Sequence, residues 1–245
     1  MIRQMFVFGL ALVSQPVRAQ PLSCQTPATV AAPPIALPDG PARNLPISHY
    51  VLALTWAPDF CETHAGAFQD GGGDAALECN GRAARFGFVL HGLWPDADNG
   101  TWPQWCAARA PATLQVPADV TRAMLCTTPS PGLIAHEWAK HGTCMAIRPQ
   151  VYFAQSAAMF HALHFPDMAA LARRSRLTVG DLRGAFADAN PRYPRTSIGV
   201  MVGVRVGGGV SLQEVHLCLG RTLRPAPCAQ RGTADGAAIG IAPPG

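Results

Sequence analysis

The sequence predicts an α+β domain in which a central, mainly antiparallel sheet packs with several helices and is stabilised by disulfides. The predicted strands and helices do not alternate regularly, which argues against a doubly wound parallel sheet. Three consecutive glycines, 207–209, join two apolar stretches, 197–206 and 210–219, a pattern typical of an antiparallel hairpin. The chain also contains eight cysteines, an even number that indicates disulfide bonds.

Two further segments are predicted to form strands. Residues 49–56 (HYVLALTW) alternate in polarity, and residues 85–91 (RFGFVLH) form an apolar run suited to a buried strand. His91 ends this run, and the Gly and Pro that follow predict a turn. In the second strand of the hairpin, alternation places three side chains on one face: Glu214, His216 and Cys218.

Helices are predicted over four segments: 118–126, 133–141, 149–164 and 179–189. Before the second helix, Ser130 is a candidate N-cap and Pro131 suits the first turn. Gly142 is well placed to end that helix. Thr178 is a candidate N-cap for the fourth helix.

Residues 1–19 have the pattern of a secretory signal peptide, with a basic Arg3, an apolar run over 5–13 and small residues before a cleavage point after Ala19. The apolar run is too short to cross a bilayer, which takes about 20 residues. We therefore expect a periplasmic or secreted protein without a membrane association after cleavage. An even number of cysteines behind a signal peptide suits four disulfides, and the absence of any Cys-x-x-Cys pair disfavours a zinc site.

Composition divides the remaining chain into three parts. Residues 20–46 are rich in Pro and Ala and predict an extended N-terminal arm, tied down by Cys24. Residues 47–228 form the predicted main domain, and residues 229–245, rich in Gly and Ala, predict a poorly ordered tail. Without the signal peptide, Lys and Arg number 17 against 15 Asp and Glu, so charge alone does not indicate a nucleic-acid partner.

Reactive side chains are concentrated in two segments, 88–96 (FVLHGLWPD) and 136–144 (HEWAKHGTC). Taken alone, His91 also fits a core histidine, and the charged residues of the second segment also fit a solvated helix face. On a helix Glu137 and His141 share a face, because they are four residues apart. His136 and His141 lie five apart and about 140° out of phase, so they do not form the His-Glu-x-x-His zinc motif and we expect no metal.

These two segments, together with WAPDFC at 56–61, resemble the active-site and neighbouring segments of the ribonuclease T2 family, over about residues 47–228. The resemblance implies an endoribonuclease that cleaves single-stranded RNA to 2′,3′-cyclic phosphate and then to 3′-phosphate ends. It implies that His91 protonates the leaving 5′-oxygen and that His141 takes the proton of the 2′-hydroxyl. His136, Glu137 and Lys140 would hold the phosphate and stabilise its transition state, Glu137 as part of the catalytic set.

An internal 2′-hydroxyl nucleophile and two imidazoles require no cofactor, and DNA, which lacks that hydroxyl, would be spared. The resemblance also implies that three residues bind the base 5′ to the cut: Trp94, Asp96 and Trp102. Each tryptophan also fits core packing. The family's second base site usually has an aromatic residue or Gln just before the His-Glu-Trp segment, where this chain has residues 133–135 (LIA).

For the cysteines, the resemblance implies Cys61–Cys79, Cys106–Cys144 and Cys218–Cys228, leaving Cys24 and Cys126 to each other. We expect a monomer whose partner is its RNA substrate, without an obligate protein partner. The alternative is a secreted binding or toxin-like protein on the same scaffold, because a fold does not determine a function.

Overall fold

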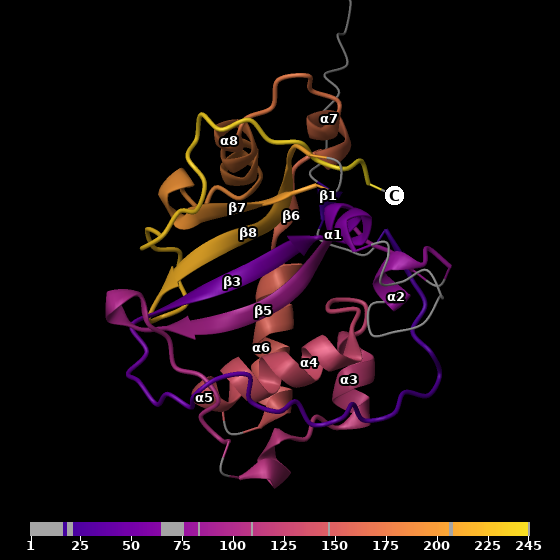
Figure 1. Cartoon of the computed structure of the whole chain (residues 1–245), viewed down its shortest axis with the longest axis vertical. Coiled ribbons are helices and arrows are strands. Elements are labelled where there is room, and N and C mark those ends of the chain that lie inside the picture. Colours follow the sequence, from indigo (N-terminus) through magenta and orange to yellow (C-terminus); the bar gives the residue numbers. More distant parts are fainter. Residues whose placement is uncertain are drawn as a thin grey trace, which may run out of the picture.

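The computed structural model describes residues 17–18, 22–64, 76–82, 84–108, 110–146, 148–205 and 208–244. Its main sheet has four strands in the order β5-β3-β8-β7, and each neighbouring pair is antiparallel (Figure 1). The bounds of these strands are β3 (His49–Trp56), β5 (Phe88–Asp96), β7 (Ile198–Val204) and β8 (Val210–Gly220). The α+β prediction and the glycine hairpin are confirmed.

The strand β5 runs past the point at which the sequence predicted a turn. Ala53 of β3 pairs with Gly92, whereas the next residue, Leu54, pairs with Leu90. His91 is therefore the extra residue of a β-bulge, and the ladder resumes after it as far as Asp96. The predicted turn is wrong because a bulge absorbs the irregularity without ending the strand.

The helices agree with the sequence in position and differ in detail. Their bounds are α3 (Ala118–Met124), α4 (Pro131–Glu137), α5 (Thr143–Met145), α6 (Pro149–His161) and α8 (Val179–Ala189). Ser130 caps α4 by accepting a hydrogen bond from the Leu133 amide, and Thr178 forms a capping box with Asp181 at the start of α8.

Gly142 does not end the helix that carries the second reactive segment. After α4 the backbone continues as a π-helical stretch, η4 (Trp138–Gly142), and then as α5. A Cβ on Gly142 would overlap Trp138 and lie 2.9 Å from the ring of Tyr152. The glycine therefore serves close packing against these two rings, and π-helical turns of this kind are frequent at functional sites.

The smaller elements join the sheet to its surroundings. Their bounds are β1 (Val17–Arg18), β2 (Ser23–Cys24), α1 (Ala57–Thr63), α2 (Ala76–Cys79), β4 (Ala84–Arg85), η2 (Asp98–Gly100), η3 (Pro111–Leu114), β6 (His164–Phe165), α7 (Met168–Ala172) and η5 (Arg195–Ser197). β2 pairs with β4, and β1 pairs with β6. Apart from β1, the predicted signal peptide (1–19) lies outside the described residues.

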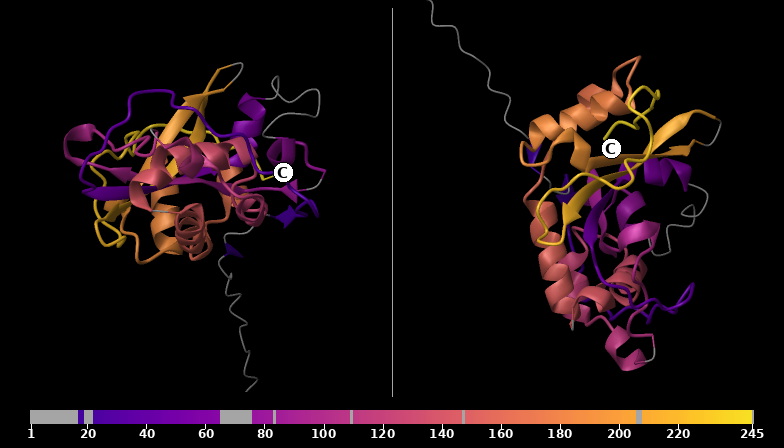
Figure 2. Two further views of the ribbon diagram at one scale, coloured as in Figure 1. Left: turned by 90° about the horizontal axis from the view of Figure 1, so that it is seen from below. Right: turned by 90° about the vertical axis from the view of Figure 1, so that its left-hand side faces the viewer.

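Helices at both edges of the sheet, and one behind it, enclose one main hydrophobic core. Figures 1 and 2 show α6 crossing behind the sheet, with α3, α4 and α5 beyond the β5 edge and α8 beside β7. Leu54, Leu90 and Val215 from the strands and Phe186 from α8 are at most 1% exposed in this core. The two reactive segments therefore lie on elements that pack into this core. Within the described residues, no helix is long and apolar enough to cross a membrane.

The N-terminal arm follows the surface in an extended form, as predicted, and Cys24 ties it to Cys126. Side-chain amides hold it further along: Gln115 donates to the carbonyl of Pro33, and Gln104 donates to that of Pro41. These contacts bring the last third of the arm to the second reactive segment.

The tail after Cys228 is packed, so the prediction of a poorly ordered segment is wrong. Ile239, Ile241 and Ala242 are each 6% exposed and belong to the core or its edge. The tail also pairs with the hairpin, since the amide of Leu212 donates to Gly240 O at 3.1 Å. The overall composition of the tail did not reveal these few apolar residues. Because they are packed, the domain extends to the end of the described chain.

The eight cysteines form the three pairs that the resemblance implies, Cys61–Cys79, Cys106–Cys144 and Cys218–Cys228, and the remaining pair, Cys24–Cys126. Four disulfides in a chain of this length are typical of proteins that fold in an oxidising compartment. They therefore suggest a secreted protein.

Candidate active site

The bulge in β5 decides which side chains reach the site. In a regular strand, Leu90, Gly92 and Trp94 would share one face, because side chains alternate. With His91 as the extra residue, Leu90 and Leu93 both turn to the core, and His91 and Trp94 both turn away from it. The rings of His91 and Trp94 meet edge-to-face, with centroids 5.0 Å apart.

Polar groups from neighbouring segments hold the backbone on both sides of the bulge. The amide of Leu90 donates to Thr127 O at 2.9 Å, and the Thr128 hydroxyl donates to Leu90 O at 2.8 Å. The buried Tyr152 hydroxyl donates to Leu93 O at 3.1 Å. These bonds satisfy the outer edge of β5 and keep the bulge in one conformation.

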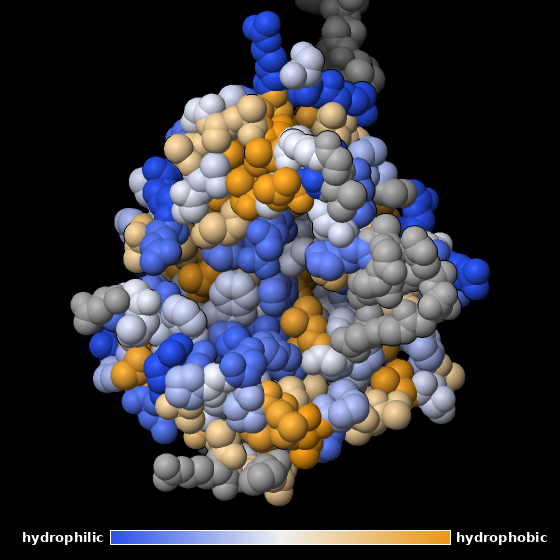
Figure 3. Space-filling view, in the orientation of Figure 1, coloured by the Kyte–Doolittle hydropathy of each residue, from blue (hydrophilic) through white to orange (hydrophobic). Residues whose placement is uncertain are grey.

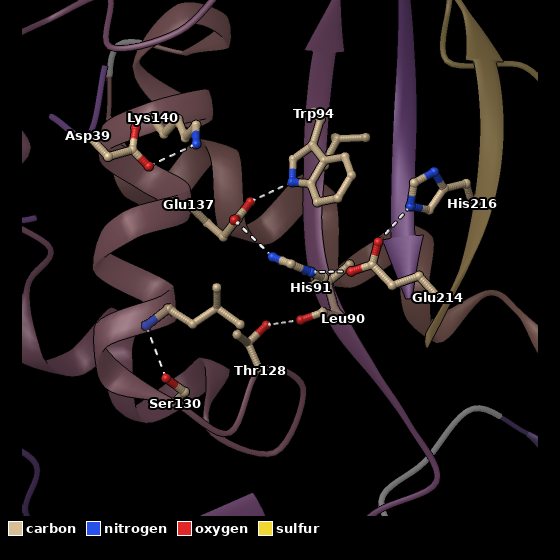
Figure 4. Close-up of polar contacts among 12 residues, drawn as sticks. Asp39, Leu90, His91, Trp94, Thr128, Ser130, Glu137, Lys140, Glu214 and His216 are labelled. Carbon is tan, nitrogen blue, oxygen red and sulfur yellow. Dashed lines mark hydrogen bonds and ion pairs between the residues drawn. The ribbon is translucent and has the colours of Figure 1, made fainter. Parts of the chain in front are cut away.

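His91 lies between two carboxylates (Figure 4). Its Nδ1 is 2.5 Å from Glu214 Oε1, and its Nε2 is 3.5 Å from Glu137 Oε1. Burial alone would lower the pKa of His91. The hydrogen bond to Glu214 and the negative charges of Glu137, Glu214 and Glu78 outweigh burial and raise that pKa.

Glu137 is 2% exposed, and its Oε2 accepts a hydrogen bond from Trp94 Nε1 at 2.8 Å. Burial raises its pKa to about 7, although the positive charge of His91 opposes this rise. Glycine is required at position 92, because a Cβ there would overlap the Glu137 carboxylate. The Gly after His91 thus makes room for the acid from α4.

His141, on η4, is 7% exposed, and its ring centroid lies 5.6 Å from that of Trp94. Its Nδ1 is buried and has no hydrogen-bond partner among the described residues. Burial lowers the pKa of His141 well below its ordinary value, and the positive charges of Lys140 and His136 lower it further. The neutral form of this imidazole is therefore favoured.

His136 and Lys140, the two predicted phosphate-binding residues, gather around the buried ring of Trp105. Lys140 Nζ lies 5.9 Å from the centroid of this ring, and His136 meets it edge-on at 5.4 Å. Asp39 of the arm accepts hydrogen bonds from both Lys140 Nζ and Trp105 Nε1, each at 3.1 Å. Burial and the charge of Lys140 lower the pKa of His136.

The three predicted base-binding residues have different surroundings. Trp94 is enclosed by histidine rings, whereas Trp102 is 43% exposed and lies under the guanidinium of Arg43, 4.8 Å from its ring centroid. Asp96 Oδ2 lies 3.1 Å from His49 Nε2, and its Oδ1 accepts a hydrogen bond from the Ala97 amide. Trp94 is thus joined to the histidines, whereas Asp96 and Trp102 each contact a basic residue that precedes β5, His49 and Arg43 respectively.

A sequence model of the ribonuclease T2 family matches residues 47–186, which include both reactive segments. The chain belongs to this family. A "Probable ribonuclease" of Haemophilus influenzae is 31% identical over 157 residues, 62% of this chain and 54% of the relative. A "Ribonuclease" of Aeromonas hydrophila is 36% identical over 101 residues, 40% of this chain and 38% of the relative. The chain thus matches about half the length of the first of these curated relatives, and less of the second.

The ribonuclease T2 fold is also seen in solved structures. "RNase NT in complex with 5′-AMP" superposes with a TM-score of 0.60 and 21% identity, and covers 82% of this chain and 100% of that one. At this identity the likeness shows the fold alone. It places the four-stranded sheet and its helices within the family's known architecture.

The sequence analysis did not predict several residues that contact the candidate site. Glu214 and His216 contact the site from β8, and Asp39 and Arg43 contact it from the arm. All four lie outside the residues that the family model matches, 47–186, and outside the two active-site segments that carried the resemblance. Alternation in β8 had placed Glu214 and His216 on one face, which was the available signal.

A cleft of about 660 Å³ opens beside His91. Thr55, Glu78, Leu133 and Glu214 are among the residues that line it. In Figure 3, hydrophilic surface gathers around a hollow in the middle of the face that lies over the strands. Among the described residues, no group of three or more His, Cys, Asp or Glu side chains is arranged to hold a metal ion.

Proposed function

We propose that the protein is an endoribonuclease that cleaves single-stranded RNA by transphosphorylation to 2′,3′-cyclic phosphate and then to 3′-phosphate ends, without a metal. One observation carries this proposal: two histidines whose rings both pack against Trp94 have pKa values that are shifted in opposite directions. Such a separation supplies one acid and one base at the same pH.

The directions of these shifts support specific roles. His91, with its raised pKa, is the acid that protonates the leaving 5′-oxygen. His141, with its lowered pKa, is the base that takes the proton of the 2′-hydroxyl. The 2′-oxygen forms its bond to phosphorus as the bond from phosphorus to the 5′-oxygen breaks, so no water or metal-bound hydroxide is needed in this step.

Charge on the pentacoordinate phosphorane requires stabilisation by donors and cations. Lys140 lies beside His141 on η4 and supplies positive charge, and His136, one turn before Lys140 on α4, supplies a hydrogen-bond donor. Glu137, at a pKa of about 7, is protonated in mildly acidic solution and then offers a hydrogen-bond donor to a phosphate oxygen. Asp39, which now binds Lys140, has to yield part of this contact to the phosphate.

The cleavage products and the substrate range test this function directly. Purified protein is incubated with total RNA and with single-stranded DNA, each with and without EDTA, and the RNA ends are identified. We expect RNA cleavage to cyclic phosphate and 3′-phosphate ends that is unchanged by EDTA, and intact DNA. Activity that vanishes in EDTA and returns with zinc or magnesium would contradict the mechanism. No cleavage at all would favour the binding or toxin-like alternative.

We propose that Trp94, Trp102 and Asp96 bind the base 5′ to the cut, with adenine preferred. A carboxylate accepts hydrogen bonds, so Asp96 favours bases that present an amino group over uracil. Trp102 is an exposed indole that Arg43 and Gln104 hold in place, and it suits stacking worth about 1–3 kcal/mol per base.

Substitution of Asp96 by Asn should flatten the base preference with a smaller effect on overall rate, because the amide replaces one acceptor with a donor. Trp102→Ala should instead slow cleavage after every base, since stacking is tolerant of sequence. The measurement is kcat/KM on dinucleoside phosphates that differ in the 5′ base. His49→Gln is the control, because it removes the partner of Asp96 and leaves the carboxylate. An unchanged ranking in Asp96→Asn would mean that Asp96 only secures the end of β5.

We further propose that the protein acts as a monomer in the periplasm or outside the cell. The four disulfides support an oxidising compartment. All the proposed catalytic residues come from one chain, so the site requires no second copy. Fractionation of the native host, together with the mass in solution, tests both points.

A further inference from the structure

Glu214 lies on the inner strand β8, opposite Thr55 of β3 and Met201 of β7. Its side chain is 13% exposed, and each carboxylate oxygen has its own histidine: Oε1 is 2.5 Å from His91 Nδ1, and Oε2 is 2.8 Å from His216 Nε2. We propose that Glu214, held by His216, is a positioning residue that fixes the ring and the protonation of His91 for proton donation. This inference rests on the proposed role of His91 as the acid.

The ionised state of Glu214 determines which partner donates the hydrogen bond between Glu214 and His91 Nδ1. Burial would raise the pKa of Glu214, but the hydrogen bonds with His216 and His91 lower it to about 2. An ionised carboxylate only accepts, so His91 Nδ1 must carry a hydrogen. Nε2, on the other side of the ring, is then the nitrogen left to face Glu137 and the substrate (Figure 4).

The two carboxylates that flank His91 therefore differ in function. Glu137 has the Trp94 indole as its hydrogen-bond donor and a pKa of about 7, so it loses its charge in mildly acidic solution. Glu214 keeps its charge throughout that range and continues to favour the imidazolium. Its position on an inner strand, with neighbours on both sides, makes it the more rigid of the two supports.

Other charged groups around His91 are consistent with this assignment. The titratable groups on the elements around His91 are Glu214 and His216 from β8, Glu137 and His136 from α4, Lys140 and His141 from η4, and Glu78 from α2. The His91 ring hydrogen-bonds to Glu214 at 2.5 Å, whereas Glu137 lies 3.5 Å away. Glu78, whose Oε1 is buried without a partner among the described residues, adds negative charge from the cleft only when it is ionised, because burial raises its pKa to about 7.

Leaving groups that differ in their need for a proton test the inference. Glu214→Gln keeps the shape and an acceptor oxygen and removes the charge. On a dinucleoside phosphate, we expect kcat/KM to fall by about tenfold or more, because the departing 5′-alkoxide needs the proton of His91. On a nucleoside 3′-(4-nitrophenyl phosphate), we expect little change, because nitrophenolate leaves without a proton.

The same variant should move the alkaline limb of the pH profile. Without the negative charge, the pKa of His91 falls, so the acid form is lost at a lower pH, by about one unit or more. His216→Phe, which leaves Glu214 with one partner, should move this limb in the same direction by less. The imidazole titration of His91, followed by NMR in each variant, reports the shift even if a variant is inactive.

Glu62→Gln is the matched control, because this exposed carboxylate pairs with Arg205 and has no part in the site. An equal loss on both substrates, or none on either, would overturn the proposal for Glu214. His91→Ala on the same two substrates separates this outcome from failure of the proposed function. If His91→Ala regains activity on the nitrophenyl ester and Glu214→Gln does not, only the positioning role of Glu214 is wrong. If neither variant regains activity on that ester, His91 is not the acid.

Discussion

Replacement of His91 or His141 by alanine should lower kcat/KM on single-stranded RNA by roughly 10²- to 10⁴-fold, the usual contribution of a proton-transfer residue. Both side chains lie at the edge of the core, at the β-bulge and on the π-helical stretch. Truncation there removes the acid or the base and leaves the sheet intact. The measurement is kcat/KM together with the melting temperature of each variant.

The pH profile of the native protein gives an independent check of these two roles. The rising limb should reflect deprotonation of His141, whose pKa is lowered, and the falling limb should reflect loss of the proton of His91, whose pKa is raised. We therefore expect a bell-shaped profile with an optimum below neutrality.

His164→Gln serves as the control for the two alanine substitutions, because His164 lies on β6 and outside the site. Losses below tenfold in both alanine variants would place the catalytic site elsewhere.

Removal of the Cys106–Cys144 disulfide should lower both stability and activity. It joins the segment after Trp102 to α5, which follows η4 directly, with 38 residues of separation. The chain-entropy model gives on the order of 4 kcal/mol for a loop of this length. The amide of Trp105 also donates to Lys140 O at 2.9 Å. The disulfide, together with this hydrogen bond, holds the backbone beside both Lys140 and His141. Thermal unfolding and kcat/KM of the double serine variant measure the two effects.

The Cys24–Cys126 bond provides the control for this prediction. Its separation of 102 residues gives about 4.7 kcal/mol in the same model, yet it ties the start of the arm to the segment after α3 and not to the backbone beside Lys140 and His141. Both double serine variants should therefore melt at a lower temperature. At a temperature where both remain folded, only the Cys106–Cys144 variant should lose kcat/KM. Peptide mapping that pairs Cys144 with another cysteine would contradict the expectation at its root.

Local sequence determined the elements whose signals lie within a few residues. The alternation over 49–56 predicted β3 residue for residue, and the capping residues before α4 and α8 are where they were expected. The glycine turn of the hairpin was equally clear, because few other residues tolerate the backbone of a tight turn. The segments 88–96 and 136–144 indicated the family for the same reason, since each carries its motif without a gap.

Tertiary structure decided the features that depend on partners far along the chain. The bulge at His91 exists because β3 resumes its pairing one residue later, and the π-helical stretch accommodates two packed rings around Gly142. The tail is ordered because the edge of the hairpin accepts its backbone and the core accepts its few apolar side chains. Composition counts residues and does not locate the surface they cover.

The electrostatics of the site were also beyond the sequence. Glu214 lies 123 residues from His91, and Asp39 lies 101 residues from Lys140, so no local pattern joins these pairs. A histidine or a carboxylate acquires its working pKa from burial and from charges within a few ångströms. The sequence therefore determined which acid–base groups the protein contains, whereas only the folded chain decided which of them hold a proton.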